Sequence, residues 1–389
     1  MDISIYFEIV SENFITETEE ASRLRISDIS DIYTKENDFP DLENTKLAIF
    51  GINEERGSIN NAGCANAPDE VRKYFYPLFA HWNSVKIADL GNIKNGHTVD
   101  DTYFAIREVV SELLKNNIIP IIIGGSQDLT YANYLAYENI GRVINIASVD
   151  PVFDLGHDEH ELNANSWLSR IILHQPNFLF NFTNIGYQTY FVDQDSLVLM
   201  KNLYFDVNRL GNVRANLEES EPMIRNIVSI DMSAIRAADA PGGQNAGPNG
   251  FAGEEVCKIC RYAGMSDKLS SIGFYELNPL FDIEGRSAHL LAQMIWYFID
   301  GYMNRKGDHP ESESENYIKF NVKIEDSEED LIFLKSKLSD RWWMDVSAYS
   351  TLDKKYIKHQ FVPCSYADYQ LALKNEIPDR WWKVQQKLM

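Results

Sequence analysis

The chain has 389 residues, 44% of them hydrophobic, which is enough for a large buried core. Its 36 Lys and Arg against 58 Asp and Glu give a formal net charge of −22, which repels phosphate backbones and argues against nucleic acid or anionic membrane as partners. No apolar run approaches the roughly 20 residues that span a bilayer, and the acidic start lacks the layout of a signal peptide, so we expect a cytoplasmic protein.

Residues 1–45 are polar and acidic with scattered aromatics, and they predict an irregular N-terminal arm. From residue 46 to 302, apolar strands alternate with amphipathic helices. The expected strands are Lys46–Ile52, Val85–Asp89, Ile118–Ile123, Arg142–Val149, Phe178–Ile185, Leu203–Phe205, Ile227–Ile230 and Leu269–Glu276. The expected helices are 68–75, 98–115, Leu129–Tyr137, Trp167–Leu173, Leu197–Leu203, Glu254–Ala263 and Ser287–Tyr302. This alternation predicts an α/β fold, a three-layer αβα arrangement around a doubly wound, mostly parallel sheet.

Residues 303–389 form a C-terminal extension of different composition, beginning with a charged, turn-rich segment at 306–316. The extension contains an internal repeat, because Asp340–Trp343 and Asp379–Trp382 both read DRWW. A tryptophan pair can serve an interface, so a homo-oligomer or a protein partner bound through this extension is possible. The simpler interpretation, which we favour, is that the large rings anchor the extension to the main domain.

Polar residues follow three of the predicted strands. Asp150 and Asp154 lie after one strand, Gly124–Asp128 after another, and Asp231–Ser233 after a third. Because ligands bind at the carboxyl ends of strands in open α/β sheets, we expect these groups to share one crevice.

Cys257 and Cys260 form a CxxC, which can belong to a metal site or a redox pair. The sequence has no second CxxC, and this one lies in a predicted helix, where the two positions merely share a face. We therefore interpret both as ordinary thiols.

The order of short motifs resembles the arginase–agmatinase–formimidoylglutamase (ureohydrolase) family, and most closely its formimidoylglutamase branch, over about Lys46 to Tyr302. The landmarks are Phe50–Ile52, Arg56–Gly57, Ala67–Arg72, Gly124–Gln127, Ser148–Asp154, Ser229–Ser233, Ala240–Gly242, Glu276–Pro279 and Arg286–Ala288. The resemblance implies an arginase-like fold. In active members it also implies two manganese ions, held by two His and four Asp, which activate a water to attack a guanidinium or formimino carbon.

This chain departs from the implied ligand set at three positions. Gln127 and Val152 stand where the family has its two histidines, and Ser233 stands at one aspartate. A valine has no lone pair, and a neutral amide oxygen is a poor manganese ligand compared with imidazole. We therefore expect no dinuclear metal site, no cofactor and no catalytic residues.

The three remaining ligand positions are Asp150, Asp154 and Asp231. As an alternative, they could hold one divalent ion, Mn, Mg or Ca, with waters. A rearranged site that uses His157 or His160 is a further alternative.

Arg236 stands at a third family aspartate, close in sequence to these carboxylates. Since a guanidinium is always charged and can bind carboxylates bidentately, we hypothesise that Arg236 replaces the missing cations.

The resemblance also implies a substrate pocket. Glu276 matches the family glutamate that receives the guanidinium or formimino group, although it could instead be paired with a neighbour such as Arg236. Asn163 and Asn165 lie where family members bind the amino-acid end of the substrate.

Three hypotheses follow. The first is a catalytically inactive ureohydrolase-fold protein, a pseudoenzyme, with a binding or scaffolding role. The second is a metal-dependent C–N hydrolase of the formimidoylglutamase or agmatinase type with an atypical metal site, acting on linear amidines. The third is a sensor of an amino-acid-like ligand.

Overall fold

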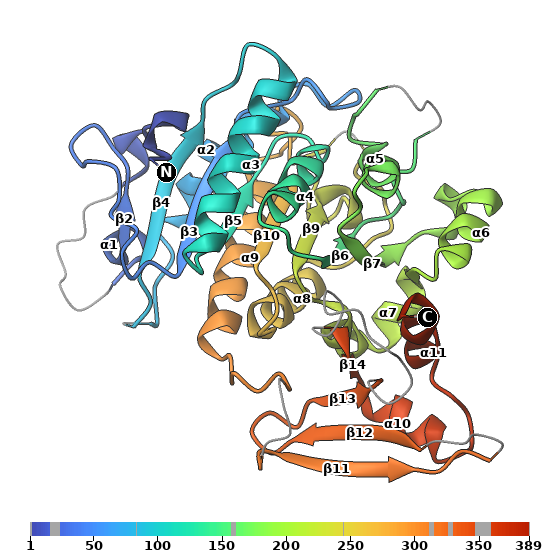
Figure 1. Ribbon diagram of the computed structural model, residues 1–389. Helices are drawn as coiled ribbons and strands as arrows, with labels where there is room; N and C mark the ends of the chain where they lie inside the picture. The colour runs from blue at the N-terminus through green and yellow to red at the C-terminus, as the bar shows by residue number, and fades with distance from the viewer. Residues whose placement is uncertain are drawn as a thin grey trace.

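The computed structural model describes residues 2–15, 24–82, 84–156, 161–243, 245–310, 315–325, 330–346 and 359–388. Within this part, ten strands form one large sheet in the spatial order β1-β4-β3-β5-β10-β9-β6-β7-β8, with β2 also paired to β4 (Figure 1). The strands are β1 (Phe7–Glu8), β2 (Ser30–Ile32), β3 (Leu47–Ile52), β4 (Ile87–Ile93), β5 (Ile119–Ile123), β6 (Ile144–Val149), β7 (Leu179–Tyr187), β8 (Asp206–Arg209), β9 (Ile227–Asp231) and β10 (Ser271–Tyr275). All pairings are parallel except β1 with β4, as the sequence predicts.

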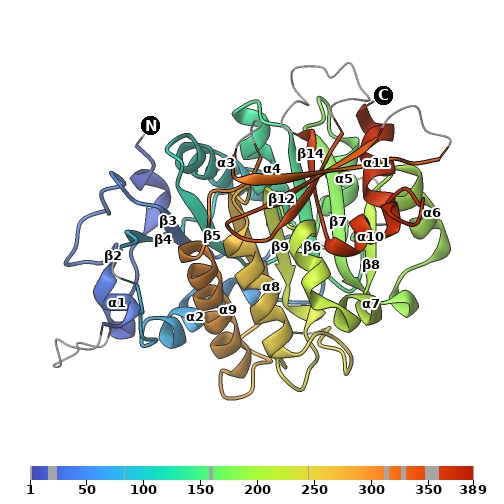
Figure 2. The ribbon, with the colours of Figure 1, turned by 90° about the horizontal axis from the view of Figure 1, so that it is seen from below.

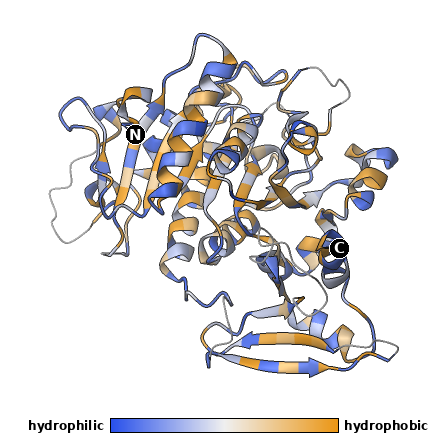
Figure 3. Cartoon of the chain, viewed as in Figure 1, coloured by the Kyte–Doolittle hydropathy of each residue, from blue (hydrophilic) through white to orange (hydrophobic). Residues whose placement is uncertain are grey.

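Two layers of helices cover the sheet, so the three-layer αβα prediction is confirmed. Figure 2 shows α2 (Ala67–Phe75), α8 (Gly253–Met265) and α9 (Arg286–Met303) on one side, and α3 (Val99–Lys115), α4 (Leu129–Asn139) and α5 (Trp167–Leu173) on the other. A separate hydrophobic core lies between the sheet and each layer. Because both faces are covered, every residue of β3, β5, β6, β9 and β10 is buried. The central strands are correspondingly rich in hydrophobic residues (Figure 3).

The largest differences from prediction are at the sheet edges. The N-terminal arm is not irregular throughout, because β1 and β2 both pair with the outer edge of β4 and a short helix α1 (Ile26–Ile29) lies between them. At the other edge, β8 begins three residues after the position expected from the sequence. It lies between α6 (Gln194–Asn202) and α7 (Leu210–Ala215).

The C-terminal extension has a sheet of its own, which the sequence did not predict. Its antiparallel strands are β11 (Tyr317–Val322), β12 (Leu331–Ser336), β13 (Trp342–Asp345) and β14 (Phe361–Cys364), followed by α10 (Tyr366–Ala372) and α11 (Asp379–Leu388). Their shared core includes Phe180 from β7, so the extension packs against the main sheet. In Figure 1 it lies beneath β6 and β7, with the C-terminus beside α7.

The two DRWW copies take different structures. The first begins β13 and the second begins α11. One ring in each copy is buried, with Trp343 at 3% and Trp381 at 5% exposure, whereas Trp382 is 45% exposed. Trp381 lies in the core that the extension shares with Phe180, and the anchoring role of the two copies stays a prediction. Among the described residues, no helix combines the length and apolar character that crossing a membrane requires.

Candidate functional site

The candidate site lies where four neighbouring strands end. β5, β10, β9 and β6 are adjacent in the sheet, and their carboxyl ends carry Gln127, Glu276, Asp231 and Asp150 respectively. The parallel order of these strands brings residues that are up to 149 positions apart in the chain into hydrogen-bond contact.

Asp150 and Gln127 form the centre of the site and are each 1% exposed. Gln127 Nε2 donates to Asp150 Oδ2 at 2.9 Å and lies 3.4 Å from Ser229 Oγ. The backbone N–H of Val152 donates to Asp150 Oδ1 at 2.8 Å. Both oxygens of this carboxylate therefore accept hydrogen bonds from the protein. The two donors, Gln127 and Val152, are the residues that stand where the family resemblance implies histidine.

The other two carboxylates are held in a similar way. Asp154 Oδ2 accepts a hydrogen bond of 2.9 Å from the indole Nε1 of Trp167, and Asp231 Oδ1 accepts one of 2.7 Å from the backbone N–H of Ser233. Asp154 has a backbone φ of +50°, a conformation that L-residues adopt at an energetic cost and that often marks functional sites.

Burial dominates the electrostatics of this group. It raises the pKa of Asp150, and it raises the pKa of Asp154 and of Asp231 well above the usual range of aspartate. The negative charge of Asp150 raises the pKa of both neighbours further. These shifts follow from acids that lie close together with little compensating positive charge among the described residues.

The hypothesis that Arg236 supplies that charge is wrong. Its Nε contacts Asp239 Oδ2 at 2.9 Å, and its side chain is 40% exposed. Asp239 also accepts from the N–H of Gly253 at the start of α8, so the guanidinium is held against the α8 side of the fold. The alternative pairing of Glu276 with Arg236 is excluded by the same geometry.

Glu276 instead belongs to the buried network. Its Oε1 accepts from the backbone N–H of Gln127 at 2.8 Å, and its Oε2 accepts from Asn61 Nδ2 at 2.8 Å. Burial raises the pKa of Glu276 to about 7, and its φ is +66°. Sequence reasoning missed Asn61, although it lies in the Gly- and Asn-rich loop that follows β3.

A cavity of about 460 Å³ opens beside these acids. The predicted residues that line it are Val152, Asp154, Asn165, Asp231 and Ser233. Asn163 does not line it. Its Oδ1 accepts from the N–H of Asn165 at 2.9 Å and so supports the turn.

The lining of this cavity also includes Phe191 and Asp193, which the sequence analysis did not single out. They lie between β7 and α6, where Asp193 caps α6 by accepting from the N–H of Ser196 at 2.7 Å. Phe191 is 56% exposed, and the signal in the sequence is an aromatic residue shortly after the predicted strand Phe178–Ile185.

The donor set does not fit a pair of manganese ions. Among the described residues, no group of three or more His, Cys, Asp and Glu is arranged to hold a metal ion. The carboxylate oxygens face N–H donors, and Val152 and Gln127 supply no imidazole. His157 and His160 lie outside the described residues. Cys257 and Cys260 are free thiols on α8 whose side chains are buried in the core.

Comparison with known proteins identifies the family to which this sequence is similar. The profile of the Arginase family matches residues 45–300. The formimidoylglutamase of Staphylococcus haemolyticus is 25% identical over 288 residues, which cover 67% of this chain and 90% of the relative. The formimidoylglutamase of Staphylococcus aureus (strain MRSA252) is 24% identical over 273 residues, which cover 65% and 85%.

Solved structures show the same fold. The formimidoylglutamase of Bacillus subtilis aligns with a TM-score of 0.66 at 17% identity, covering 75% of this chain and 95% of the other. The formiminoglutamase of Trypanosoma cruzi with Mn2+2 aligns with a TM-score of 0.65 at 18% identity, covering 73% and 100%. The chain described above, with its ordered motifs at the carboxyl edge of a parallel sheet, therefore belongs to the arginase family.

Proposed function

We propose that this protein is a catalytically inactive member of the family that uses the cavity beside Asp154 and Asp231 to bind a small, amino-acid-like ligand. One observation carries the proposal. Protein N–H groups hydrogen-bond the carboxylates that the family resemblance assigns to metal ions, and the amide of Gln127 occupies the position of an imidazole.

The physical reason concerns the activation of water. Hydrolysis of a guanidinium or formimino carbon near neutral pH needs a strong Lewis acid to generate hydroxide. Gln127 offers Asp150 an N–H donor rather than a lone pair, and the backbone N–H of Val152 engages the second oxygen. Without the paired ions, these residues have no means of lowering the pKa of a bound water.

The cavity retains features that suit ligand binding. Asp154 and Asp231 supply carboxyl groups to its lining, and Asn165 supplies an amide. Burial and the neighbouring carboxyl groups raise the pKa values of both acids, so a cationic group that enters the cavity meets two acceptors that have no positive partner among the described residues. An amidine or guanidine with an amino-acid end has this chemistry. A protein partner or a second copy bound through the C-terminal extension stays a prediction.

A metal-dependent hydrolase is the second candidate, and two observations favour it. The relatives named above are formimidoylglutamases, and one of the solved structures carries Mn2+2. Glu276 and the three aspartates stand at the positions that the resemblance assigns to substrate and metal.

Three measurements on the full chain separate the candidates. Calorimetry with manganese tests for stoichiometric binding. Thermal shift with formiminoglutamate, arginine and agmatine tests for ligand binding. Product assays for formamide, urea and ammonia test for turnover. We expect a ligand to raise the melting temperature without product release, with a stabilisation of about 2.7 kcal/mol at a hundredfold excess over Kd.

Asp231→Asn should abolish the ligand-induced shift, whereas Asp195→Asn on α6 is the matched control that should retain it. Binding of two manganese ions per chain, or turnover that Asp231→Asn removes, would overturn the proposal in favour of the hydrolase. Failure of every compound to shift the melting temperature would refute a small-ligand role.

A further inference from the structure

A second cavity lies at the amino ends of the strands, between the main sheet and the C-terminal extension. Its volume is about 230 Å³. The starts of β6, β7 and β8 and the residues before β9 form one wall, and β14 and α11 form the other. The candidate site is at the carboxyl ends of these strands, so the two regions share no lining residue.

Arg225, two residues before β9, lines this cavity with its guanidinium outside ion-pair distance of every described carboxylate. In the part of the chain that the structure describes, its guanidinium has no hydrogen bond and no ion pair. Burial and the nearby Arg380 lower the pKa of Arg225 to about 10, against the opposing effect of Asp206. A guanidinium in a cavity wall normally binds a carboxylate or a backbone carbonyl, because its desolvation is costly.

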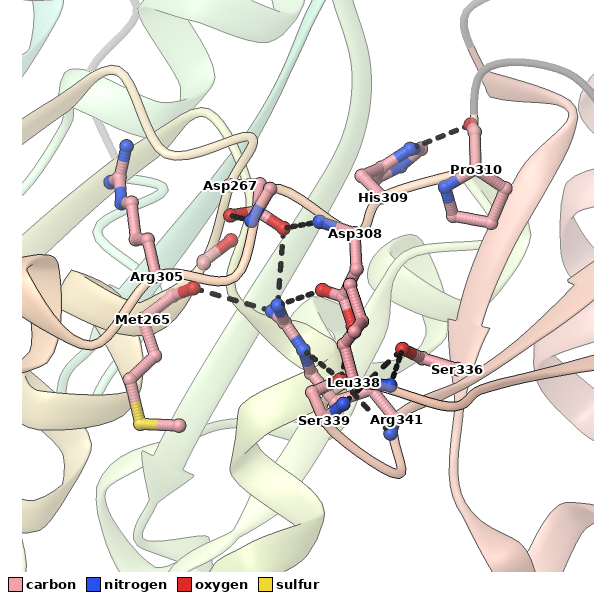
Figure 4. A network of polar contacts seen from close by, with 12 residues as sticks. Met265, Asp267, Arg305, Asp308, His309, Pro310, Ser336, Leu338, Ser339 and Arg341 are labelled. Carbon is pink, nitrogen blue, oxygen red and sulfur yellow. Dashed lines mark hydrogen bonds and ion pairs between the residues drawn. The ribbon is translucent and has the colours of Figure 1, made fainter. Parts of the chain in front are cut away.

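Arg341 shows what a satisfied arginine looks like in the same junction (Figure 4). Its Nη2 lies 3.1 Å from Asp267 Oδ2 and also contacts Asp308, and its Nη1 donates to the carbonyl of Met265 at 3.3 Å. Its Nε donates to Ser339 Oγ at 3.1 Å. The lack of partners at Arg225 is therefore not a general property of this junction.

Two further cations face the cavity from α11. Arg380 uses Nη2 to bind Glu219 at 2.9 Å, but its Nη1 is buried and has no hydrogen-bond partner. Lys383 Nζ donates to Asp206 Oδ1 at 2.8 Å. Asp206, whose side chain is 26% exposed, also attracts Lys387 and Arg225, so one partly buried carboxylate serves several cations.

We propose that this cavity binds a small oxyanion, a phosphate or a carboxylate group, between the guanidinium groups of Arg225 and Arg380. Planar guanidinium groups bind such oxygens in pairs of parallel hydrogen bonds. The anion would satisfy the Nη1 atom of Arg380 and give Arg225 its counter-ion. Because Arg225 belongs to the main sheet and Arg380 to α11, the bound anion would link the extension to the domain.

The larger space next to this cavity suggests that the anion is the head of an organic molecule. A cavity of about 450 Å³ is also lined by Arg225 and shares Pro222 and Pro363 with the smaller one. Its walls include Trp342 and Tyr366, which can pack against an apolar or aromatic body.

The test uses the full chain and inorganic phosphate as the first probe, with acetate in a second arm and chloride at matched ionic strength as reference. We expect phosphate, acetate or both to raise the melting temperature in a saturable way, and the comparison of the two identifies the preferred oxyanion. Arg225→Gln should weaken the apparent affinity at least tenfold. It should fold normally, since it removes an unpaired charge.

The matched control is Arg209→Gln on β8, because Arg209 is exposed and does not line the cavity. It should keep the wild-type affinity. An oxyanion effect no larger than that of chloride would overturn the proposal, and so would an equal effect in wild type and Arg225→Gln. Neither result depends on the ligand of the candidate site, because manganese and amidines are absent from this assay.

Discussion

Gln127→Met tests whether a side-chain amide has replaced a metal ligand at Asp150. Methionine has nearly the volume of glutamine, so the change removes the donor without opening a large cavity. Gln127 and Asp150 are each 1% exposed, so water cannot readily replace the lost hydrogen bond of 2.9 Å. Asp150 Oδ1 would keep its bond from the N–H of Val152, but Oδ2 would lose the amide donor.

The expected loss follows from that single contact. A hydrogen bond to a charged group contributes about 1.5–3 kcal/mol to stability. With about 2.1 cal/mol/K of unfolding entropy per residue, 389 residues give roughly 0.8 kcal/mol/K, so the melting temperature should fall by about 2–4 °C. Urea unfolding followed by fluorescence measures the free energy directly, and added manganese should not reverse the loss.

A double-mutant cycle with Asp150→Asn isolates the pair, because the cost of Gln127→Met should shrink once the carboxylate is absent. Gln194→Met is the control at an exposed position on α6, with an expected change within about 0.5 kcal/mol. If Gln127→Met were as stable as wild type, or if manganese restored its stability, the view that the Gln127 amide has replaced a metal ligand at Asp150 would be refuted.

Three other predictions concern stability. Arg72→Met should cost about 3–5 kcal/mol in urea unfolding, because it strips the fully buried Asp89 of its guanidinium partner at 2.8 Å, whereas Arg107→Met at a surface pair should cost less than about 1 kcal/mol. Burial lowers the pKa of Lys387 to about 7, so between pH 7 and 10.5 the unfolded chain binds the proton that the folded chain has lost. Stability should therefore rise with pH across that window, and Lys387→Met should flatten the rise in a thermal-shift series. Phe333→Ala should cost about 3–5 kcal/mol and expose the C-terminal extension to limited proteolysis before the main domain, since Phe333 is fully buried in the core of the extension.

The central fold could be predicted because its signals are local and redundant. The continuous apolar run at Ile119–Ile123 indicated a strand covered on both faces. At the start of α3, Thr98 and Asp101 form a capping box, in which each side chain accepts from the other's backbone N–H, at 3.2 and 2.7 Å. Strands whose existence depends on a neighbour were harder. β8 reads Asp-Val-Asn-Arg, with little strand propensity, and its pairing with β7 determines where it lies.

The sequence located the strand ends that form the site, but it did not identify every residue there or the direction in which each side chain points. Chain order was enough to select Gln127 and Asp150, because parallel strands place their carboxyl ends together. It could not show which way Arg236 points, because the turn after β9 carries that side chain to Asp239, three residues away. Asn61 was missed because its partner Glu276 is 215 residues distant, and no local pattern indicates such a pair.

The two cavities lie at opposite ends of the strands of one sheet, and their charge imbalances have opposite sign: acids at the carboxyl ends and an arginine at the amino ends. At the carboxyl ends of the strands, Asp154 and Asp231 are buried and, among the described residues, hydrogen-bond N–H donors but no cation. At the amino ends, Arg225 is partly buried and forms no ion pair with a described residue, although Asp206 lies near enough to attract it. An uncompensated buried charge destabilises a fold, so each imbalance is either tolerated at a cost or relieved by a ligand of opposite sign. Toleration and relief by a ligand predict different responses to added ions. If ligands relieve the imbalances, cationic amidines should stabilise the protein by binding at Asp231, and oxyanions should stabilise it by binding at Arg225. The two stabilisations should add when both ligands are present, because the sites share no residue.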